Sequence, residues 1–324
     1  KVIPVSHWKY NEEDREVMFE SFISDVANNI MNKFQWLKQL WTLWWGNHFM
    51  EIAYDQNNEI WIVIHSWSRG IWHKVASHHM ELAKEINFSN LDLLKQLEEE
   101  FDSNKRYDDV RKHNPEKYEE IRWFNVEKKI KELSKWNLEW HYWFNINSKE
   151  GKNYITDMTF CLEFALHNRK IMLKKVMQIV RSITNQYPIL DIDNDIINRN
   201  HNHATIRDWL WIHRKGATHS EKWMYWIIPG NMRDWSFVVR GKWNADSLYS
   251  SSHGAGRLHG RKEAQRKFNL DTFKDQMTWI KAKVEDSTID ESPSAYKDIF
   301  EVIELQKDSV DVINYLKPLI NIKG

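Results

Sequence analysis

Glycine is scarce in this chain of 324 residues, which contains 10 of them. A usage of about 7% would give roughly 23. Tryptophan is abundant, with 19 residues, and Cys161 is the single cysteine. One cysteine excludes an internal disulfide framework and indicates a reducing cytoplasm. No apolar run reaches about 18 residues, so the sequence predicts no membrane span, and no signal peptide is visible.

Charge is balanced overall but unevenly distributed. The formal net charge is zero, so the total indicates no partner. Residues 207–267 carry 12 Lys/Arg against 5 Asp/Glu, and residues 92–121 carry 6 against 10. The basic segment is suited to binding phosphates, whereas the acidic segment is typical of solvated helix faces.

Apolar spacing predicts a mixture of helices and strands. Residues 47–55 and 59–66 are β-branched and aromatic runs joined by "QNNE", which predicts a hairpin. Three further strand-like runs each end in glycine: 210–216, 224–230 and 236–241. Helical spacing covers 16–34, 71–86, 151–184, 261–277 and 294–316, with Cys161 as a core residue of its helix. The fold class is therefore α+β or α/β, with a charged helical insertion at 88–149.

Four histidines lie at predicted strand ends or beside small turn residues: His48, His65, His201 and His253. Such positions place a side chain at the edge of a rigid scaffold, where functional residues concentrate. Six other histidines are interpreted as ordinary surface or core residues: His7, His73, His78, His79, His113 and His141.

The sequence "HGAGR", from His253 to Arg257, is the most informative motif. Glycines on both sides of an alanine allow backbone N–H groups to approach an anion such as a phosphate. A histidine there is placed to attack phosphorus and form a phosphoramidate, with the arginine stabilising charge. The alternative is a glycine turn with an incidental histidine.

Taken together, these motifs resemble the RtcB family of RNA-splicing ligases. The matching segments are "GNHFMEI", "IHSWSRG", "HNHATI", "HRKGAT", "IIPGNM", "SSSHGAGR", "DESPSAYKDI" and the terminal "IKG", and they extend from about residue 37 to the last residue. The resemblance implies one catalytic domain over 1–324, with an RtcB-like mixed sheet core, flanking helices and the insertion at 88–149.

The resemblance also implies an activity. It is the joining of RNA 3′-phosphate or 2′,3′-cyclic phosphate ends to 5′-hydroxyl ends through a histidine–GMP intermediate, in tRNA splicing or RNA repair. GTP is the cosubstrate, and manganese is the metal, with two ions in the complete protein. The partners are RNA and GTP, with no membrane, and the protein is expected to be a cytoplasmic monomer.

Site residues follow by position in the matching motifs. His253 matches the nucleophile, and His48, His65 and His201 match metal ligands. Arg69 matches an RNA-contacting arginine, and Arg257 is assigned to the same contact. Guanylate contacts are matched by Asn47, Glu51, Asn202, Pro229, Gly230, Asn231, Met232, Ser236, Gly254, Ala255, Gly256 and Lys323.

One departure from the family concerns the metal. The family has an upstream element with an Asp and a Cys that are both metal ligands, and nothing here matches it. The chain also does not begin with Met, so we expect an N-terminally truncated ligase. One alternative is a catalytically impaired remnant that binds guanylate or RNA. Another is a histidine-rich metallohydrolase, which would need neither "HGAGR" nor Lys323.

The tryptophans are the second departure. Ten stand where the family pattern has glycine: Trp41, Trp44, Trp45, Trp67, Trp72, Trp223, Trp226, Trp235, Trp243 and Trp279. Trp61 and Trp211 lie inside strand runs and are interpreted as authentic. Seven are left unassigned: Trp8, Trp36, Trp123, Trp136, Trp140, Trp143 and Trp209. The hypothesis is a codon, with UGA as the candidate, that the source organism reads as glycine; the rival is an aromatic surface that stacks on RNA.

Overall fold

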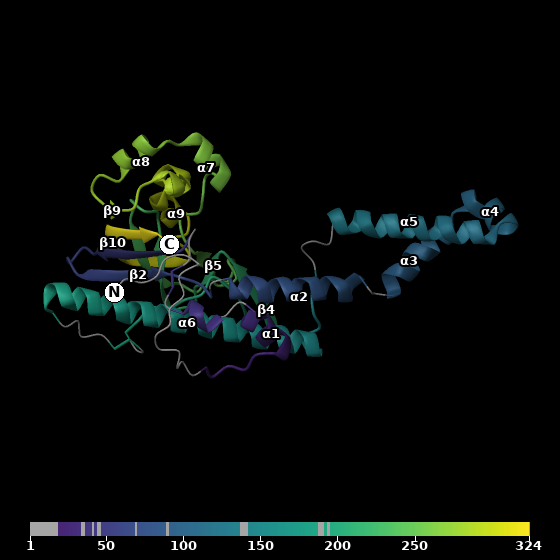
Figure 1. Ribbon diagram of the computed structural model, residues 1–324, viewed down its shortest axis with the longest axis horizontal. Helices are drawn as coiled ribbons and strands as arrows, with labels where there is room; N and C mark the ends of the chain where they lie inside the picture. The colour runs from purple at the N-terminus through teal and green to yellow at the C-terminus, as the bar shows by residue number, and fades with distance from the viewer. Residues whose placement is uncertain are drawn as a thin grey trace. The chain divides into compact units, whose positions relative to one another are not determined.

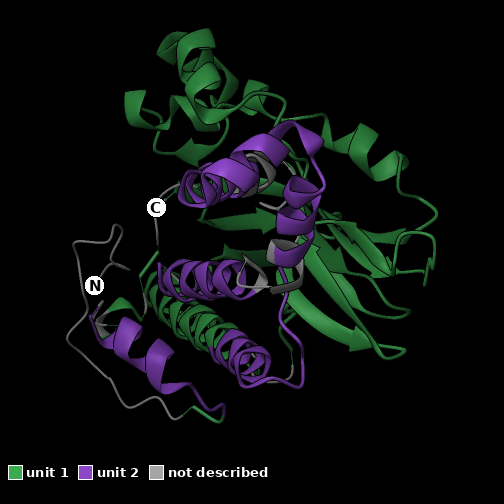
Figure 2. Cartoon of the chain, turned by 90° about the vertical axis from the view of Figure 1, so that its right-hand side faces the viewer, with its two compact units in different colours: residues 1–20, 35–69, 161–324 green, residues 21–34, 70–160 purple. Residues whose placement is uncertain are grey.

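The chain is described as a computed structural model that divides into two compact units (Figure 2). Unit 1 comprises residues 1–20, 35–69 and 161–324, and unit 2 comprises residues 21–34 and 70–160. The structure describes residues 19–33, 36–40, 42–43, 47–68, 70–88, 91–136, 142–186, 191–192 and 195–323.

Unit 1 is built on an antiparallel sheet with the strand order β2-β1-β10-β7-β6, and a short strand, β9, pairs in parallel with β10 (Figure 1). The strands are β1 (Phe49–Tyr54), β2 (Ile60–His65), β6 (Tyr225–Pro229), β7 (Ser236–Gly241), β9 (Lys281–Ala282) and β10 (Val310–Lys323). The predicted hairpin is β1–β2, and the predicted strands at 224–230 and 236–241 are β6 and β7. An α+β fold class is therefore confirmed.

The last strand corrects one prediction. Helical spacing predicted a helix over 294–316, but α9 covers only Ile299–Glu304, and β10 begins at Val310. β10 is hydrogen-bonded to β1 on one side and β7 on the other, so two sheet partners override the helical pattern. Its Pro318 lies opposite Ala53, where the register shifts, as expected for a proline within a sheet.

Two small antiparallel pairs are the other described strands of unit 1. β3 (Asn202–Arg207) pairs with β4 (Leu210–Lys215), and β5 (Ala217–His219) pairs with β8 (Ser250–Ser252). Arg207 is paired with Leu210, so the β3–β4 turn consists of two residues. β4 confirms the strand predicted at 210–216.

Tryptophan occupies left-handed backbone in three turns of unit 1. The φ angles are 65° at Trp209, 67° at Trp223 and 72° at Trp243, the same region as Gly216 at 65° and Gly256 at 76°. A bulky residue at positive φ is a steric outlier. Two of these positions belong to the ten at which the family pattern has glycine.

The other tryptophans in that group show no positive φ or lie outside the described residues. Trp226 is fully buried on β6, and Trp235 stacks on Tyr315 with ring centroids 4.7 Å apart. Trp279 is 93% exposed. Trp41, Trp44 and Trp45 are outside the described part of the chain. Trp61 and Trp211 lie on β2 and β4, as the sequence predicted.

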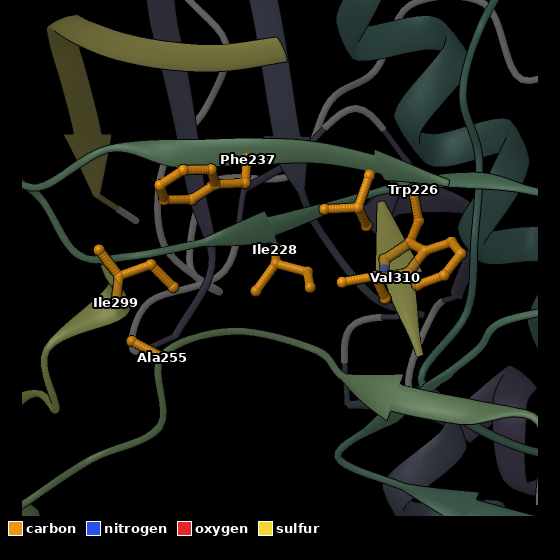
Figure 3. Packing of buried hydrophobic residues seen from close by; sticks show 7 residues of the cluster. Trp226, Ile228, Phe237, Ala255, Ile299 and Val310 are labelled. Atoms are coloured by element: carbon orange, nitrogen blue, oxygen red, sulfur yellow. The ribbon is translucent and has the colours of Figure 1, made fainter. Parts of the chain in front are cut away.

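The core of unit 1 lies between the sheet and the segments that return across it. Figure 3 shows Trp226 and Ile228 of β6, Phe237 of β7 and Val310 packed with Ala255 and Ile299. A second cluster joins β1, β2, β7 and β10 through Phe49, Ala53, Val63, Val238 and Leu316. Ala255 belongs to the "HGAGR" loop, so the core anchors the segment that carries His253.

Short helices follow β8. They are α7 (Arg261–Lys267), α8 (Leu270–Gln276), η3 (Asp286–Glu291), η4 (Pro293–Ala295) and α9. The helix predicted over 261–277 is two helices, because Asn269 leaves helical geometry and its side chain accepts a hydrogen bond from the Thr272 N–H as the N-cap of α8. η1 (Trp36–Gln39) precedes β1 in the same unit.

Unit 2 is helical. It contains α1 (Asp25–Lys33), α2 (Ile71–Phe88), α3 (Leu91–Asp102), η2 (Lys105–Tyr107), α4 (Asp108–His113), α5 (Pro115–Trp136) and the first part of α6 (Lys149–Thr184), which continues into unit 1. The helices predicted at 71–86 and 151–184 are α2 and α6, and the insertion is helical where described. Cys161 is buried in α6, as predicted.

Two details of unit 2 test smaller predictions. The helix predicted from residue 16 begins at Asp25, and residues 19–24 are not helical. His79 is a core histidine whose Nε2 lies 2.8 Å from the buried carboxylate of Asp157. None of the described helices is both long and apolar enough to cross a membrane.

Candidate active site

The four singled-out histidines lie at strand ends of unit 1 and form a continuous row. His48 precedes β1, His65 ends β2, His201 precedes β3 and His253 follows β8. Ring centroids are 6.0 Å apart for His48 and His65, 5.3 Å for His65 and His201, and 4.8 Å for His201 and His253. The rings of His48 and His253 are thus linked through those of His65 and His201. The structure brings together the four histidines that the sequence placed at strand ends or turns.

Burial favours the neutral form of His65, His201 and His253, and repulsion between histidines adds to this at His65 and His201. Burial lowers the pKa of His65 well below its ordinary value, and the nearby charges of His201, His48, Lys323 and His253 lower it further. Burial and then His253 lower the pKa of His201 to about 4. Burial also lowers the pKa of His253. Neutral imidazole carries a free lone pair, which is the form that binds metals or attacks an electrophile.

Two of the histidines have the spacing of ligands to one metal ion. The Nε2 atoms of His65 and His201 are 3.2 Å apart. Two nitrogens bound tetrahedrally at about 2.0–2.1 Å from one ion are about 3.3–3.4 Å apart. The described residues contain no group of three His, Cys, Asp or Glu side chains already placed to hold a metal. The pair therefore fits two ligands, and His48 as a third remains a prediction.

A buried arginine that the sequence did not single out fixes the segments of this pair. Arg169, on the unit 1 part of α6, donates Nη1 to the carbonyl of Ser66 at 2.9 Å. Its Nε and Nη2 donate to Oδ1 of Asn198 at 3.0 and 2.6 Å. Asn168 Nδ2 donates to Ser66 Oγ at 3.1 Å. Helix α6 thus fixes Ser66, which follows His65, and Asn198, which lies three residues before His201. The regular helical spacing around Arg169 gave no indication of this role.

Glu51 is a buried carboxyl group beside the row. Its Oε1 accepts from the Ser236 hydroxyl at 3.3 Å, and its Oε2 accepts from Asn321 Nδ2 at 2.9 Å. Burial raises its pKa to about 7, although these hydrogen bonds and Lys323 oppose the shift. Glu51 and Ser236 were both predicted guanylate contacts, and the structure brings them together. Asn321 was missed; its position two residues before Lys323 places both on one face of β10.

Gly216 connects three predicted site residues. Its N–H donates to the His201 carbonyl and to Asn202 Oδ1, both at 2.9 Å. The His253 ring lies against the same glycine, because a Cβ on Gly216 would be 3.3 Å from its Cε1. The Gly216 backbone partly opposes the lowering of the His253 pKa by burial.

The glycine loop after His253 packs on the end of β6. Ala255 N–H donates to the Pro229 carbonyl at 2.9 Å, and Gly254 N–H donates to Ser252 Oγ at 3.3 Å. A Cβ on Gly254 would lie 3.3 Å from the Pro229 carbonyl oxygen. These two N–H groups therefore donate within the protein, and in this arrangement neither is a free donor for the anion that the sequence predicted.

The remaining predicted residues lie in the same unit. Asn231 caps the turn after β6 by accepting from the N–H groups of Arg233 and Asp234, each at 2.9 Å, and Gly230 N–H donates to the Trp235 carbonyl at 3.1 Å. Met232 is buried in a cluster with Phe273, so it can face a ligand only through its backbone. Arg69 lies outside the described residues.

Arg257 and Lys323 share a carboxylate partner, Glu291, which the sequence interpretation left without a role. Arg257 Nη1 lies 3.1 Å from Glu291 Oε1, and Lys323 Nζ lies 2.6 Å from its Oε2. Arg257 Nε also donates to the His259 carbonyl at 3.1 Å. Asn47 accepts from Arg261. The motif "DESPSAYKDI" contained Glu291, but partners 32 and 34 residues away give no local signal.

The fold and site define a class: an α+β protein with a row of histidines at strand ends and a buried carboxyl group in the same unit. Residues 8–324 match the family described as tRNA-splicing ligase RtcB. The chain therefore belongs to the RtcB family.

Individual relatives agree. The chain is 30% identical over 295 residues to the RNA-splicing ligase RtcB of Escherichia coli (strain K12), covering 89% of this chain and 62% of that protein. It is 26% identical over 346 residues to the tRNA-splicing ligase RtcB of Nanoarchaeum equitans, covering 93% and 63%. The chain thus spans about three-fifths of the length of these relatives.

Proposed function

We propose that this protein is an RNA ligase that joins RNA 3′-phosphate or 2′,3′-cyclic phosphate ends to 5′-hydroxyl ends, with GTP as cosubstrate and His253 as the nucleophile. The observation that supports it most is the state of His253. Its ring lies against Gly216, where a Cβ would be 3.3 Å from its Cε1, and its centroid is 4.8 Å from that of His201. Burial lowers its pKa.

The first step balances with these groups alone. The lone pair of His253 attacks the α-phosphorus of GTP, the N–P bond forms, and the P–O bond to pyrophosphate breaks. Where the end is a 2′,3′-cyclic phosphate, water first opens it to the 3′-phosphate. An oxygen of the 3′-phosphate then attacks the phosphorus of the histidine–GMP, and the N–P bond to His253 breaks. The 5′-hydroxyl attacks the 3′-phosphorus and loses its proton, and GMP leaves as the phosphodiester forms. Glu51, with a pKa of about 7, and Lys323 provide buried polar groups for the guanylate.

His65 and His201 would hold manganese, with His48 as the further ligand. Bound there, the ion neutralises phosphate charge. The two neutral imidazoles need no proton loss to bind it, and their 3.2 Å separation suits one ion. The partners proposed are RNA with broken ends and GTP, and the proposed setting is tRNA splicing or RNA repair by a cytoplasmic monomer.

The test is transfer of α-labelled GMP to the full chain in manganese. Wild type should become labelled, and His253→Ala should remain unlabelled. His213→Ala is the control, because His213 is an exposed histidine of unit 1 that lies on β4 outside the row. Equal labelling of wild type and His253→Ala would refute the assignment of the nucleophile.

A second candidate is a guanylate- or RNA-binding remnant without ligation. It is favoured by the absence, among the described side chains, of a preassembled group of three metal ligands. GTP binding by wild type without any labelling in manganese would support this candidate and exclude the ligase.

A further inference from the structure

Glu291 is the centre of a buried charged cluster in unit 1. Its side chain is 4% exposed and has four side-chain partners. Oε1 lies 3.1 Å from Arg257 Nη1 and 3.0 Å from Arg261 Nη1. Oε2 lies 2.6 Å from Lys323 Nζ and accepts from the Tyr296 hydroxyl at 2.6 Å. Both carboxylate oxygens are thus fully used in holding other side chains.

Lys323 connects this cluster to the histidine row. Its Nζ lies 5.3 Å from the centroid of the Phe49 ring, and that ring packs edge-on against His65 at 5.3 Å. The charge of Lys323 is among those that lower the pKa of His65. Because Lys323 is only 8% exposed, a second buried group must fix its ammonium, and Glu291 does so.

Arg257 connects the same carboxylate to the nucleophile loop. It lies four residues after His253 in the loop whose Ala255 is packed in the core. All of its guanidinium nitrogens donate to protein acceptors, which include Glu291 and the Asp290 carbonyl. Arg257 therefore holds the loop rather than presenting free donors.

The cluster as a whole keeps a positive charge. Arg257, Arg261 and Lys323 are cations, and Asp290, which pairs with Arg261, and Glu291 are carboxylates. These five groups carry one net positive charge. Burial raises the pKa of Glu291, but Lys323, Tyr296 and Arg261 outweigh burial and leave it lowered, so the carboxylate stays ionised. A net positive charge around a buried carboxylate favours an anion such as a nucleotide phosphate.

We propose that Glu291 is a positioning residue for the guanylate: it holds Lys323 beside the histidine row and Arg257 on the His253 loop in one arrangement. This inference rests on the proposed function. Glu291 acts through these two cations and touches neither the substrate nor the reacting phosphorus. Removing its charge should therefore weaken guanylate binding in a way that depends on Lys323.

The test is a double-mutant cycle on the full chain, with GTP affinity measured by calorimetry. Glu291→Gln keeps the shape and removes the charge, and it should raise the Kd for GTP by about tenfold, as should Lys323→Met. Because both changes break one interaction, the double variant should bind no more than about threefold more weakly than either single variant. Tyr296→Phe, which removes only the hydroxyl donor, should raise the Kd by about threefold.

Asp55→Asn is the matched control. Asp55 is 2% exposed and has a bonding network of its own, with Trp61 Nε1 at 3.1 Å and Asn314 Nδ2 at 2.8 Å, at the opposite end of β1. It should lower the melting temperature without changing the Kd. Additive effects of Glu291→Gln and Lys323→Met, or a Kd that follows melting temperature across all variants, would overturn the positioning role alone. No GTP binding by wild type would overturn the proposed function as well.

The left-handed turns support a second and independent inference. We infer that glycine is the native residue at 209, 223 and 243. The β3–β4 turn contains only Asp208 and Trp209, at φ 48° and 65°. Two-residue hairpin turns with both φ angles positive strongly prefer Asp-Gly or Asn-Gly. The glycine shortage of the chain has the same explanation, and the turn adds Trp209 to the positions involved.

Peptide mass spectrometry of the protein isolated from its source organism tests this. The peptides that contain positions 209, 223 and 243 should have the masses of glycine. Trp61 and Trp211, on strands, are the internal controls and should be read as tryptophan. Native tryptophan at 209, 223 and 243 would overturn the inference.

Discussion

The two ends of the β3–β4 hairpin have the same backbone angle but different residues. Gly216, directly after β4, has φ 65°, and Trp209, in the turn between the strands, also has φ 65°. At the open end a Cβ would lie 3.3 Å from Cε1 of His253, so glycine is needed for space as well as for conformation. At the turn end the side chain is 94% exposed, so only the backbone is strained.

The two ends of the hairpin are destabilised by different effects. Near the histidine row, glycine removes backbone strain, and the unfavourable contribution to folding is the burial of polar groups such as Glu51 and His65. At the exposed turns the cost is backbone strain of about 1–3 kcal/mol for each residue forced into a disfavoured region. Strain at a turn does not reach the site, so the two ends respond to different experiments.

The largest effect is expected at the buried end, from Glu51. Its pKa rises from 4.5 to about 7 on folding, so the folded protein binds this proton more tightly than the unfolded chain does. Its contribution to the free energy of unfolding is therefore greatest below pH 4.5 and falls by about 3 kcal/mol as the pH rises to 7. Urea unfolding measured across this pH range gives the free energy of unfolding of wild type and of Glu51→Gln. The difference between the two values should fall by this amount.

The difference between these two proteins isolates Glu51 from the histidines, which titrate in both. Ser236→Ala serves as a further control, because it removes one hydrogen bond to Glu51 at 3.3 Å without removing the carboxyl group. A wild-type minus Glu51→Gln difference that is independent of pH would show that the carboxyl group is not buried as described.

At the strained turns we expect substitutions to stabilise the protein rather than to destabilise it. Replacing Trp209, Trp223 and Trp243 together by glycine should raise the free energy of unfolding by roughly 2–3 kcal/mol. Relief of left-handed strain exceeds the roughly 0.5–1 kcal/mol of extra freedom that glycine has in the unfolded chain. Trp243 should give the smallest gain, because Arg207 lies 4.3 Å above its ring. Chemical denaturation measures the gain, and no gain in the triple variant would contradict it.

Gly216→Ala tests the open end of the hairpin. The new methyl group combines a positive φ with contact to the His253 ring, so stability should fall by about 1–2 kcal/mol. GMP labelling should fall about tenfold, because the new methyl group would displace the His253 ring. Gly260→Ala is the control, since a Cβ there meets nothing within 4 Å. Equal labelling of the two variants would show that Gly216 does not influence the reaction of His253.

Much of the site was predictable because its signals are local. Strand ends with small polar neighbours placed His48, His65, His201 and His253, and the structure brings all four together. β10 was misassigned because its apolar spacing fits a helix until β1 and β7 are present on either side.

The residues that hold the site together carry no such signal. Arg169 was missed because its hydrogen-bond partners, Ser66 and Asn198, are 103 and 29 residues away, and within α6 it reads as an ordinary polar position. The partners of Glu291 are equally remote in sequence. The glycines at 254 and 256 predicted the loop after His253. The turn at 208–209 was not predicted, because tryptophan stands where glycine would have indicated it.

The smallest expected effect is the sharpest test of the comparison, because it concerns one exposed side chain. Trp209→Gly should stabilise the protein by about 1 kcal/mol, through relief of the left-handed strain in a two-residue turn. Trp209→Asn should give part of the gain, since asparagine tolerates this conformation better than other residues with a Cβ. Trp209→Phe should give none, and Trp211→Gly, on a regular strand, should destabilise. If the aromatic surface is instead authentic, Trp209→Gly should weaken binding of single-stranded RNA by about 1–3 kcal/mol, the stacking energy of one base, while Trp209→Phe retains it. Unfolding curves and RNA titrations of the same four variants therefore decide whether position 209 serves the turn or the ligand.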